Sequence, residues 1–374
     1  MIAGGGTGGH LYPGIALAHE LRRRPAGCDV LFVGTRRGLE ATIVPREGFR
    51  VEFIEAAGLN RMGLKQTARN LMLVPRSLLQ ARRLIRDYRP DLVMGVGGYA
   101  SGPLVLAAWW LGRPTLILEP NAYPGLTNRW LAPVVDRVAL ALADAGRFFG
   151  DKAVVTGIPV REEFFRLPAR ARSEGELRLL VYGGSQGSRA LNAIVCGDLE
   201  ELNRLGPGLR LTHQTGEREL ETVRGAYQEH GMAGEVEAYF PRIHEQFAQA
   251  DLILSRAGAG TLAEITAAGK AAILVPFPGA ADDHQTRNAL ALERYGAVRM
   301  IPEGNWRPGR LAAELRAFME RPGDIDRMGE AAHRLARPEA ARRIAELIEQ
   351  LVPGHGSRKP ARNGRGVPEE QTDV

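Results

Sequence analysis

Short apolar runs alternate with amphipathic segments along the first half of the chain. The runs at 29–35, 91–98, 114–121 and 136–142 each hold several consecutive apolar residues next to turn-forming or polar positions. This pattern is typical of strands buried on both faces of a parallel sheet. Helical periodicity fills the intervals, for example at 14–24 and 67–88. Strands that alternate with helices predict a doubly wound α/β domain.

The second half repeats this organisation. An apolar run at 177–182 leads into the glycine-rich segment GGSQGS at 183–188, and further runs lie within 209–216, 236–240, 251–255 and 271–278. Each half therefore opens with a strand, a glycine loop and a helix start, since GGGTGGH occupies 4–10. Such sheets bind ligands beyond the carboxyl ends of their strands. Two facing sheets predict a ligand in the cleft between two domains.

The two ends of the chain differ from this pattern. Residues 301–351 are predicted to be mainly helical, with breaks near Pro322 and Pro338, whereas the segment from Pro353 onward has hardly any apolar residue and is predicted to be disordered. Only Met1–Ala3 precede the first glycine loop. A first strand this short forfeits several ladder hydrogen bonds, each worth about 0.5–1.5 kcal/mol, so we expect the natural start to lie upstream.

Composition narrows the class of protein. A chain of 374 residues with 44% hydrophobic and 25% charged residues fits two soluble globular domains. The longest apolar run, near 103–112, is too short to span a bilayer, and no secretory signal pattern opens the chain. Cys28 and Cys196 stand far apart, which excludes a disulfide framework and a cysteine zinc site and suits a reducing cytoplasm. The net charge of +6 suits an anionic partner, or reflects an arginine-rich genome.

The first glycine loop does not by itself identify the ligand that it binds. Gly4, Gly6 and Gly9 fit the G-x-G-x-x-G spacing of a dinucleotide site, but Arg36 and Arg37 stand where an NAD site needs an acidic residue. An NADP-binding oxidoreductase therefore remains an alternative, because arginine can meet a 2′-phosphate. The glycines could also serve only to form a tight turn.

Three positions near predicted helix starts carry candidate chemistry. His10 could accept a proton from a hydroxyl, or could bond to the backbone at its helix start. Ser185 in GGSQGS lies where backbone N–H groups and the helix dipole favour an anion. Glu264, three residues after Thr261 on the predicted first turn of a helix, could accept two ribose hydroxyls, or could cap that helix.

Seven motifs in order give the chain a family resemblance. They are GGGTGGH, GGYASGP, EPNAYPGLTNRWLA, GIPVR, GGSQGS, SRAGAGTLAEI and AADDHQTRNA, within residues 3–352. Together they resemble the MurG family of N-acetylglucosaminyltransferases. The resemblance implies a GT-B fold with an acceptor domain at 1–159, a UDP-GlcNAc domain at 160–337, a helix at 338–351 that crosses back, and a tail at 352–374.

The resemblance also implies an activity. Members of the family transfer GlcNAc from UDP-GlcNAc to the 4-hydroxyl of the muramic sugar of lipid I, which forms lipid II with inversion and without a metal or cofactor. Implied partners are the two substrates, the anionic inner leaflet of the cytoplasmic membrane and cell-wall or division proteins, with no nucleic acid. A nearer alternative is another GT-B glycosyltransferase with a different acceptor.

Residue roles follow from the motif matches. His10 is the implied candidate base, with Glu119 as the second candidate. The implied UDP-GlcNAc contacts are Thr7, Gly8, Gly9, Asn121, Arg161, Ser185, Phe240 through its backbone, Ala259, Gly260, Thr261, Leu262, Ala263, Glu264 and Gln285, and the acceptor side comprises Gly97, Gly98, Tyr99 and Ser101. The chain departs from the family at Leu118 and Pro120, where histidine and glutamine are usual, and at Gly260, where leucine is common. The changes at Leu118 and Pro120 put the acceptor contacts of that loop in question. The change at Gly260 allows a looser turn at the uracil or phosphate.

A basic, apolar segment at 59–89 is the candidate membrane contact. We expect Leu64, Met72, Leu73 and Val74 to be exposed there, among many arginines. Each cation near an anionic headgroup contributes about 1 kcal/mol, and an apolar edge can lie at the interface. The alternative is an ordinary amphipathic helix whose apolar face packs on the sheet.

Overall fold

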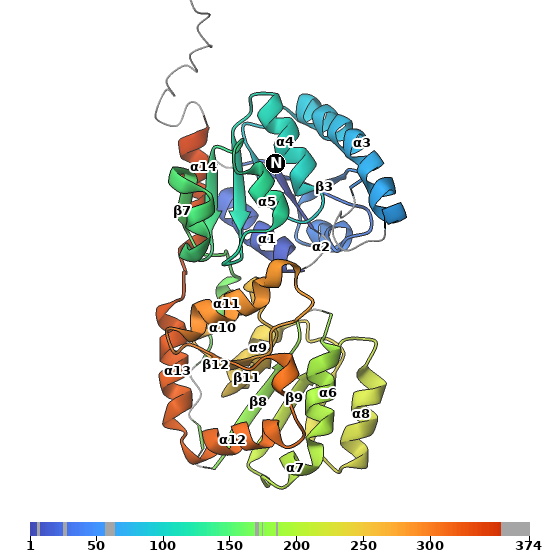
Figure 1. Cartoon of the computed structure of the whole chain (residues 1–374). Coiled ribbons are helices and arrows are strands. Elements are labelled where there is room, and N and C mark those ends of the chain that lie inside the picture. The colour runs from blue at the N-terminus through green and yellow to red at the C-terminus, as the bar shows by residue number, and fades with distance from the viewer. Residues whose placement is uncertain are drawn as a thin grey trace, which may run out of the picture.

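The computed structural model describes residues 1–5, 8–24, 28–56, 64–168, 172–173, 175–184 and 186–352, with the backbone alone at 64–72. It contains two parallel sheets in two stacked α/β domains (Figure 1). This arrangement confirms the predicted fold class.

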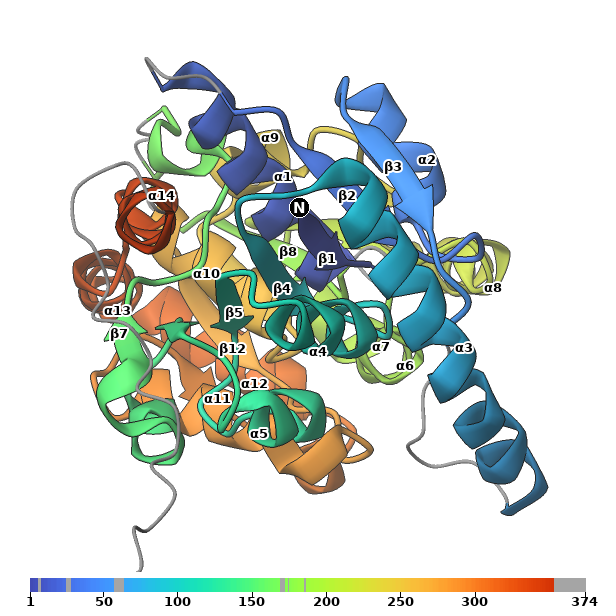
Figure 2. The ribbon, with the colours of Figure 1, turned by 90° about the horizontal axis from the view of Figure 1, so that it is seen from above.

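The first domain is built on seven parallel strands in the order β3-β2-β1-β4-β5-β6-β7. They are β1 Ile2–Gly4, β2 Leu31–Gly34, β3 Arg50–Phe53, β4 Val93–Gly97, β5 Thr115–Glu119, β6 Arg137–Leu140 and β7 Ala153–Val155. The helices are α1 Gly8–Arg23, α2 Glu40–Arg46, α3 Leu64–Tyr88, α4 Ser101–Trp110 and α5 Leu126–Leu131. Figure 2 shows α4 lying between α3 and α5, and α4 packs against both.

The second domain has six parallel strands in the order β10-β9-β8-β11-β12-β13. They are β8 Leu177–Tyr182, β9 Leu209–Gln214, β10 Gly234–Glu237, β11 Leu252–Ser255, β12 Ala271–Leu274 and β13 Arg299–Met300. The helices are α6 Arg189–Gly197, α7 Leu199–Asn203, α8 Leu220–Glu229, α9 Ile243–Gln249, α10 Ala259–Ala268, α11 His284–Glu293, α12 Arg310–Glu320 and α13 Gly323–Arg334.

The last helix, α14 (Ala340–Leu351), returns to the first domain (Figure 1). Its residues Ile344 and Ala345 are fully buried in the core that also holds Ile2 and Leu11. The α14 side chain Glu349 pairs with Arg24 at the end of α1 at 2.7 Å. The chain therefore crosses between the domains twice, near 156–160 and near 335–339, and both crossings lie on one side of the cleft.

Several sequence expectations change at this level. The first long helix begins at Gly8 within the glycine loop, six residues before the predicted start. The strands β3 and β7 and the short helix α2 were not predicted, because their few apolar residues carry no clear period. The strand β1 is as short as expected, yet it pairs with both β2 and β4. The helix breaks at Pro322 and Pro338 are confirmed, and the tail from Pro353 lies outside the described residues.

Candidate active site

The cleft between the domains gathers three polar groups around α10. Glu264 on α10 lies 3.5 Å from the guanidinium of Arg161 and, through its other oxygen, 3.5 Å from the hydroxyl of Tyr182. Arg161 comes from the linker between the domains, and its guanidinium stacks over the rings of Tyr12 and Phe164, each at 5.1 Å. A carboxylate from α10, a cation from the linker and a hydroxyl from β8 thus converge from three elements.

Burial governs the charge of Glu264. It raises the pKa of this carboxyl to about 7, although Arg161 and the hydrogen bond from Tyr182 act in the opposite direction. The helix starts at Ala259 with Gly258 at its N-cap and no side-chain cap, so Glu264 lies on the second turn instead of the first. The capping alternative for Glu264 is therefore wrong, and the carboxylate is directed to the pocket.

The pocket beside Glu264 lies between the two domains. Gly8, Gly9 and Tyr12 of α1 form one wall, and Tyr182, Gln214, Tyr239, Gly260 and Thr261 of the second domain form the other. Burial, together with the neighbouring Tyr239 across the cleft, raises the pKa of Tyr12 to about 12. A β-carbon added at Gly260 would lie 3.5 Å from the Cα of Gly9, an ordinary contact distance. The first turn of α10 therefore leaves room at Gly260 for a small side chain.

His10 packs against the second glycine turn of the first domain. Gly97 has φ 107°, and a β-carbon there would come within 2.6 Å of the imidazole. Gly98 has φ 82°, and a β-carbon there would come within 2.4 Å of the carbonyl oxygen of Gly5. Burial lowers the pKa of His10 from 6.5, the backbone of Gly5 opposes that shift, and His284 across the cleft adds to it. His10 is therefore held as a neutral imidazole at pH 7 in the cleft.

Glu119 is fully buried at the end of β5 and organises the loop that follows. One carboxylate oxygen accepts hydrogen bonds from the backbone N–H of Asn121 at 2.9 Å and from its side-chain amide at 3.2 Å. The other accepts from the backbone of Gly125 at 3.1 Å and from the Asn128 amide at 2.8 Å. Four donors thus surround the carboxylate, which favours a positioning role over that of a base.

Asn288 on α11 joins this loop to the second domain. Its side-chain oxygen accepts from the backbone of Ala122 at 2.8 Å, and its side-chain nitrogen donates to Asn121 at 3.1 Å and to the carbonyl of Ala257 at 3.3 Å. The side chain of Asn288 is completely buried. Asn121, the candidate GlcNAc contact, is therefore oriented from both domains.

Two other candidate donor contacts already have hydrogen-bond partners within the protein. Gln285 accepts hydrogen bonds from the backbones of Phe277 at 2.9 Å and Ala257 at 3.3 Å. The N–H of Phe240 donates to the side chain of Gln214 at 2.9 Å. Three further implied contacts on α10, Ala259, Leu262 and Ala263, line a second cavity described below. Thr7 and Ser185 lie outside the described residues.

The acceptor-side candidates separate into two groups. Tyr99 is 57% exposed, whereas Ser101 is 1% exposed and its hydroxyl has no partner among the described residues. A β-carbon on Gly95 would clash with that hydroxyl, so Ser101 packs inward against β4. Tyr99 stays a candidate for acceptor contact. The geometry of Ser101 favours a role at the start of α4.

Two family models match the chain: the glycosyltransferase family 28 N-terminal domain over residues 1–140 and the C-terminal domain over 178–348. A UDP-N-acetylglucosamine–N-acetylmuramyl-(pentapeptide) pyrophosphoryl-undecaprenol N-acetylglucosamine transferase of Anaeromyxobacter sp. (strain Fw109-5) is 47% identical, over 96% of this chain and 98% of the relative. The enzyme of the same name from Syntrophus aciditrophicus (strain SB) is 45% identical, over 94% of this chain and 98% of the relative.

The chain belongs to glycosyltransferase family 28, in its MurG branch. A solved structure of MurG from Acinetobacter baumannii agrees, with 29% identity and a TM-score of 0.75 over 94% of this chain and 98% of that one. The chain therefore matches members of this family of similar length across both domains.

The geometry also disfavours a dinucleotide in the first glycine loop of this family 28 chain. Glu40 is buried, and one of its carboxylate oxygens accepts hydrogen bonds from the backbone at 2.7 Å and the hydroxyl of Thr35 at 3.0 Å. β-carbons on Gly5, Gly34 and Gly38 would all collide with this side chain. Glu40 thus fills the space between Gly5 and the end of β2, where a dinucleotide would place its ribose.

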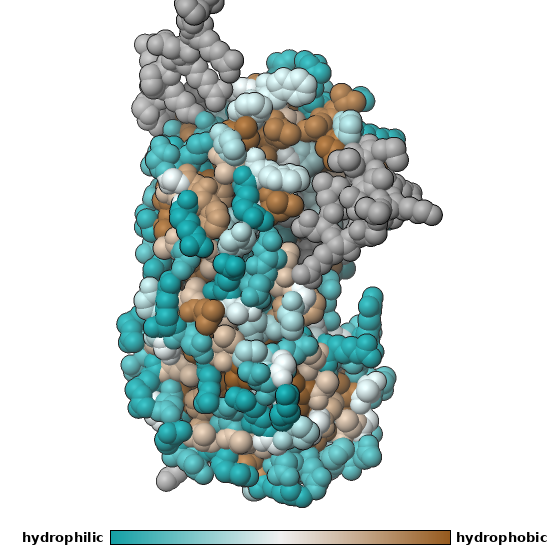
Figure 3. Space-filling model, in the orientation of Figure 1, coloured by the Kyte–Doolittle hydropathy of each residue, from teal (hydrophilic) through white to brown (hydrophobic). Residues whose placement is uncertain are grey.

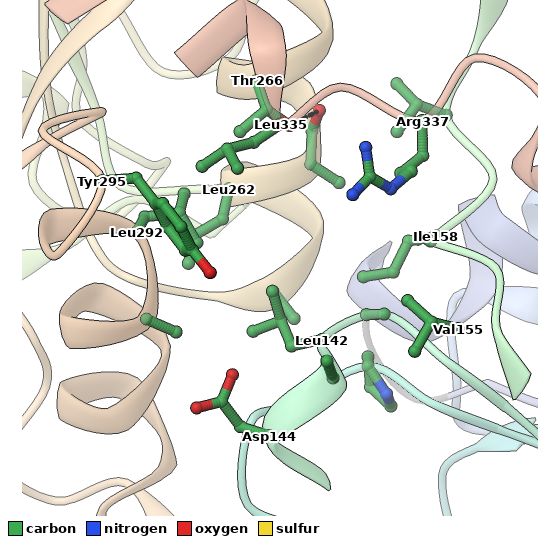
Figure 4. Close-up of a pocket in the computed structure, with 18 of the residues that line it drawn as sticks. Leu142, Asp144, Val155, Ile158, Leu262, Thr266, Leu292, Tyr295, Leu335 and Arg337 are labelled. Atoms are coloured by element: carbon green, nitrogen blue, oxygen red, sulfur yellow. Dashed lines mark hydrogen bonds between the residues drawn. The ribbon is translucent and has the colours of Figure 1, made fainter. Parts of the chain in front are cut away.

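A second cavity, of about 140 Å³, lies on the opposite face of α10 (Figure 4). Leu262 and Thr266 of α10 line it together with Leu142 of the first domain and with both chain crossings, at Ile158 and Leu335. Beside it, Arg294 forms two hydrogen bonds to Asp144 across the domain boundary, at 2.8 and 2.7 Å. This hinge cavity is separated by α10 from the donor pocket of the family 28 site.

Sequence reasoning missed several of these residues. Asn288 lies within the quoted motif AADDHQTRNA, three residues after Gln285 and hence on the same helix face, which was a usable signal. Tyr12, Tyr182 and Gln214 follow or precede recognisable motifs, but nothing local marks them as pocket residues. Among the residues described, no group of three or more His, Cys, Asp or Glu side chains could hold a metal ion.

Proposed function

We propose that this chain transfers GlcNAc from UDP-GlcNAc to the 4-hydroxyl of the muramic sugar of lipid I, which yields lipid II with inversion at the anomeric carbon. The observation that carries the proposal is a pocket where Glu264, Arg161 and the start of α10 face Gly8, Gly9 and Tyr12 of α1, the helix that carries His10, in a chain 47% identical to a transferase of that name. Its place in the cell is then the assembly of the wall during growth and division.

The donor half of the reaction is supported by charge placement. Glu264 accepts the two ribose hydroxyls, and Arg161 and the N-terminus of α10 offer positive potential to the diphosphate. Negative charge develops on the β-phosphate as UDP leaves, and preorganised donors at that point lower the barrier. Asn121, oriented by Glu119 and Asn288, faces the sugar. In the proposed mechanism, Arg161 and the N-terminus of α10 stabilise the leaving diphosphate without a metal ion.

The acceptor half needs one base. His10 is neutral at pH 7 because burial lowers its pKa, so it can take the proton of the attacking hydroxyl on the face opposite UDP. Glu119 cannot do this without giving up hydrogen bonds to its own loop. We therefore assign the base to His10 and the orientation of Asn121 to Glu119.

The test is transfer of radiolabelled GlcNAc from UDP-GlcNAc to a lipid I analogue, run with and without EDTA. We expect a disaccharide product at equal rates in both. Absence of transfer would defeat the proposed function. Transfer to an unrelated glycolipid or small-molecule acceptor, but not to lipid I, would favour another GT-B transferase. Transfer abolished by EDTA would defeat only the metal-independent mechanism.

The proposed location is the cytoplasmic face of the inner membrane, where lipid I is the acceptor. Among the described residues, no helix is long and apolar enough to cross a membrane. Leu79 is 64% and Trp110 70% exposed, and the guanidinium of Arg82 stacks on the Trp110 ring at 5.7 Å. Figure 3 shows hydrophobic surface over α4 and the neighbouring part of α3. Tryptophan and arginine side by side suit a headgroup interface.

This α3–α4 patch, defined by Leu79, Arg82, Arg83, Trp109 and Trp110, differs from the sequence expectation. Leu73 and Val74 are half-buried, and the side chains of Leu64 and Met72 lie outside the description. Flotation with vesicles containing anionic phospholipid tests the patch. We expect Trp110→Ser to reduce binding several-fold, and Leu290→Ser, an exposed leucine of the second domain, to leave it unchanged. Binding that ignores the anionic lipid fraction would remove the electrostatic part.

A further inference from the structure

The hinge cavity on the far face of α10 has no part in the proposed function. It encloses about 140 Å³, and apolar side chains of both domains form most of its walls. They are Leu142 and Val155 of the first domain, Leu262 and Leu292 of the second, and Ile158 and Leu335 of the two chain crossings. Apolar cavities of about 150 Å³ in proteins bind benzene. The hinge cavity therefore has the size and the lining for one aromatic ring.

A cation at the rim of this cavity, Arg337, forms no ion pair with any described residue. Figure 4 shows its guanidinium turned toward the cavity, and that group donates to the carbonyl of Ala336 at 3.1 Å. The other charged groups that line the cavity, Asp144 and Arg294, already pair with each other at 2.8 and 2.7 Å. The rim therefore carries a net positive charge, which suits an anion.

The two chain crossings hold Arg337 in this position. Gly157 on the first crossing has φ 85°, and a β-carbon there would come within 2.5 Å of the β-carbon of Arg337 on the second crossing. Glycine at 157 thus lets the crossings pack directly on each other. Pro338 follows Arg337 and restricts its backbone further. The stem of Arg337 is therefore anchored, and its guanidinium extends to the rim.

The rim of the cavity is open to solvent. Arg337 is exposed, and Tyr295 on the opposite side is 56% exposed. A small ligand therefore has a route to the apolar walls. A single ring that carries one carboxylate matches both features, because the ring covers apolar surface while the carboxylate reaches the guanidinium.

We propose that the hinge cavity binds a small aromatic carboxylate, with its ring among the apolar walls and its carboxylate on Arg337, and that occupancy opposes opening of the cleft. A ligand that touches both domains and both crossings binds this arrangement more tightly than one in which the domains have rotated apart. The same contacts slow the entry of a nucleotide into the donor pocket across α10. The site itself does not depend on the proposed function.

Fluorine NMR of the full chain with para-fluorobenzoate tests the site. We expect the wild type to bind this probe with a dissociation constant of about 1 mM or below, and to bind the cationic para-fluorobenzylamine more weakly. Arg337→Gln should weaken binding of para-fluorobenzoate about tenfold and leave binding of neutral fluorobenzene unchanged. Arg334→Gln, which removes an exposed arginine outside the cavity lining, is the matched control and should bind both probes as the wild type does.

A second variant tests the position of the ring. Leu142→Trp places a larger side chain in the cavity and should abolish binding of both para-fluorobenzoate and fluorobenzene. Saturating UDP should not displace para-fluorobenzoate from the wild type, because the donor pocket lies on the other face of α10. Binding that persists in folded Leu142→Trp, or displacement by UDP, would place the probe elsewhere and overturn the inference.

The remaining outcomes of the binding experiment also decide. No binding of para-fluorobenzoate by the wild type, or equal binding in Arg337→Gln and Arg334→Gln, would overturn the inference. If Leu142→Trp does not fold, the comparison of the two arginine variants decides alone.

Stopped-flow mixing with a fluorescent UDP analogue tests the effect on the cleft. Saturating benzoate should lower the association rate of the analogue severalfold in the wild type, whereas acetate at the same concentration should not. Arg337→Gln should need about ten times as much benzoate for the same effect. An unchanged rate with the cavity occupied would overturn the effect on opening. A chain that binds para-fluorobenzoate but no UDP analogue would overturn the proposed donor and not the site.

Discussion

His10 is the residue on which the acceptor half of the chemistry depends. Because burial lowers its pKa below 6.5, wild-type kcat should stay flat down to that value and fall only at lower pH, as the base becomes protonated. His10→Ala should reduce kcat by about 10²–10⁴-fold with nearly unchanged UDP affinity, and the acidic limb should vanish. Steady-state rates from pH 5 to 8 measure this. A loss of UDP binding in proportion to rate would make His10 a ligand of the phosphate loop instead.

Glu264 should give the donor site a pH dependence of its own. Its pKa is raised to about 7, so the carboxylate is present above that pH and lost as the pH falls through it. The affinity for UDP-GlcNAc should therefore decline below about pH 7 in the wild type. Glu264→Gln should weaken binding about 10- to 100-fold at pH 8, from the loss of one or two charge-assisted hydrogen bonds.

The control for this prediction is how the UDP-GlcNAc affinity of the Glu264→Gln variant depends on pH. Glu264→Gln removes the titrating group, so its affinity should be independent of pH between 6 and 8. A 2′-deoxyribose donor should be discriminated against by the wild type and hardly by the variant. A pH dependence that persists in Glu264→Gln would assign it to another group.

At the scale of elements, the loop after β5 depends on Glu119. Glu119→Gln turns one oxygen into a donor that faces Asn128 or Asn121, so buried donors lose their acceptor at about 1–3 kcal/mol each. We expect a lower melting temperature and a kcat reduced about 10- to 100-fold, with UDP affinity retained. Asn128→Ala, which loosens the same loop without altering the carboxylate, should change both quantities in the same direction. If Glu119→Gln abolishes kcat at full stability, Glu119 is the base.

The elements themselves were largely predictable, and the contacts between them were not. The central strands could be found because each is a short apolar run buried on both faces, as at β4 and β11. The sequence pattern placed the start of α1 too late. Glycine has a low helix propensity, so Gly8 and Gly9 in the first turn gave no helical signal. The partners of Glu264 come from β8 and from the linker, and Gln214 meets Phe240 26 residues away. No local pattern encodes such pairs.

At the scale of the whole molecule, the cleft must widen for the donor to enter. The donor pocket encloses about 90 Å³, whereas ligand pockets usually measure about 300–1,000 Å³. Side chains of the two domains are bonded across the cleft at Asn288 with Asn121 and at the ion pairs Arg129–Asp282 and Arg294–Asp144. We expect opening about the two chain crossings to break these contacts and closure on the donor to restore them.

Asp144→Asn tests this hinge. It weakens the paired hydrogen bonds to Arg294 beside the hinge cavity, on the other side of α10 from the donor pocket. Both side chains are partly exposed, so the pair contributes only about 0.2–1 kcal/mol. Since the pair opposes opening, the association rate of a fluorescent UDP analogue should rise up to about fivefold, with a smaller change in its dissociation rate. Moderate salt should produce part of the same increase in the wild type by screening.

Glu200→Gln is the matched control for Asp144→Asn. Glu200 pairs with Arg204 on the surface of the second domain alone, so its loss removes an ion pair without touching the cleft. Stopped-flow traces of this variant should overlay those of the wild type at every salt concentration. An equal acceleration in both variants would attribute the effect to net charge, because each substitution removes one negative charge and raises the attraction of the chain for an anionic nucleotide. An acceleration confined to Asp144→Asn would mean that the domain contact itself limits donor entry.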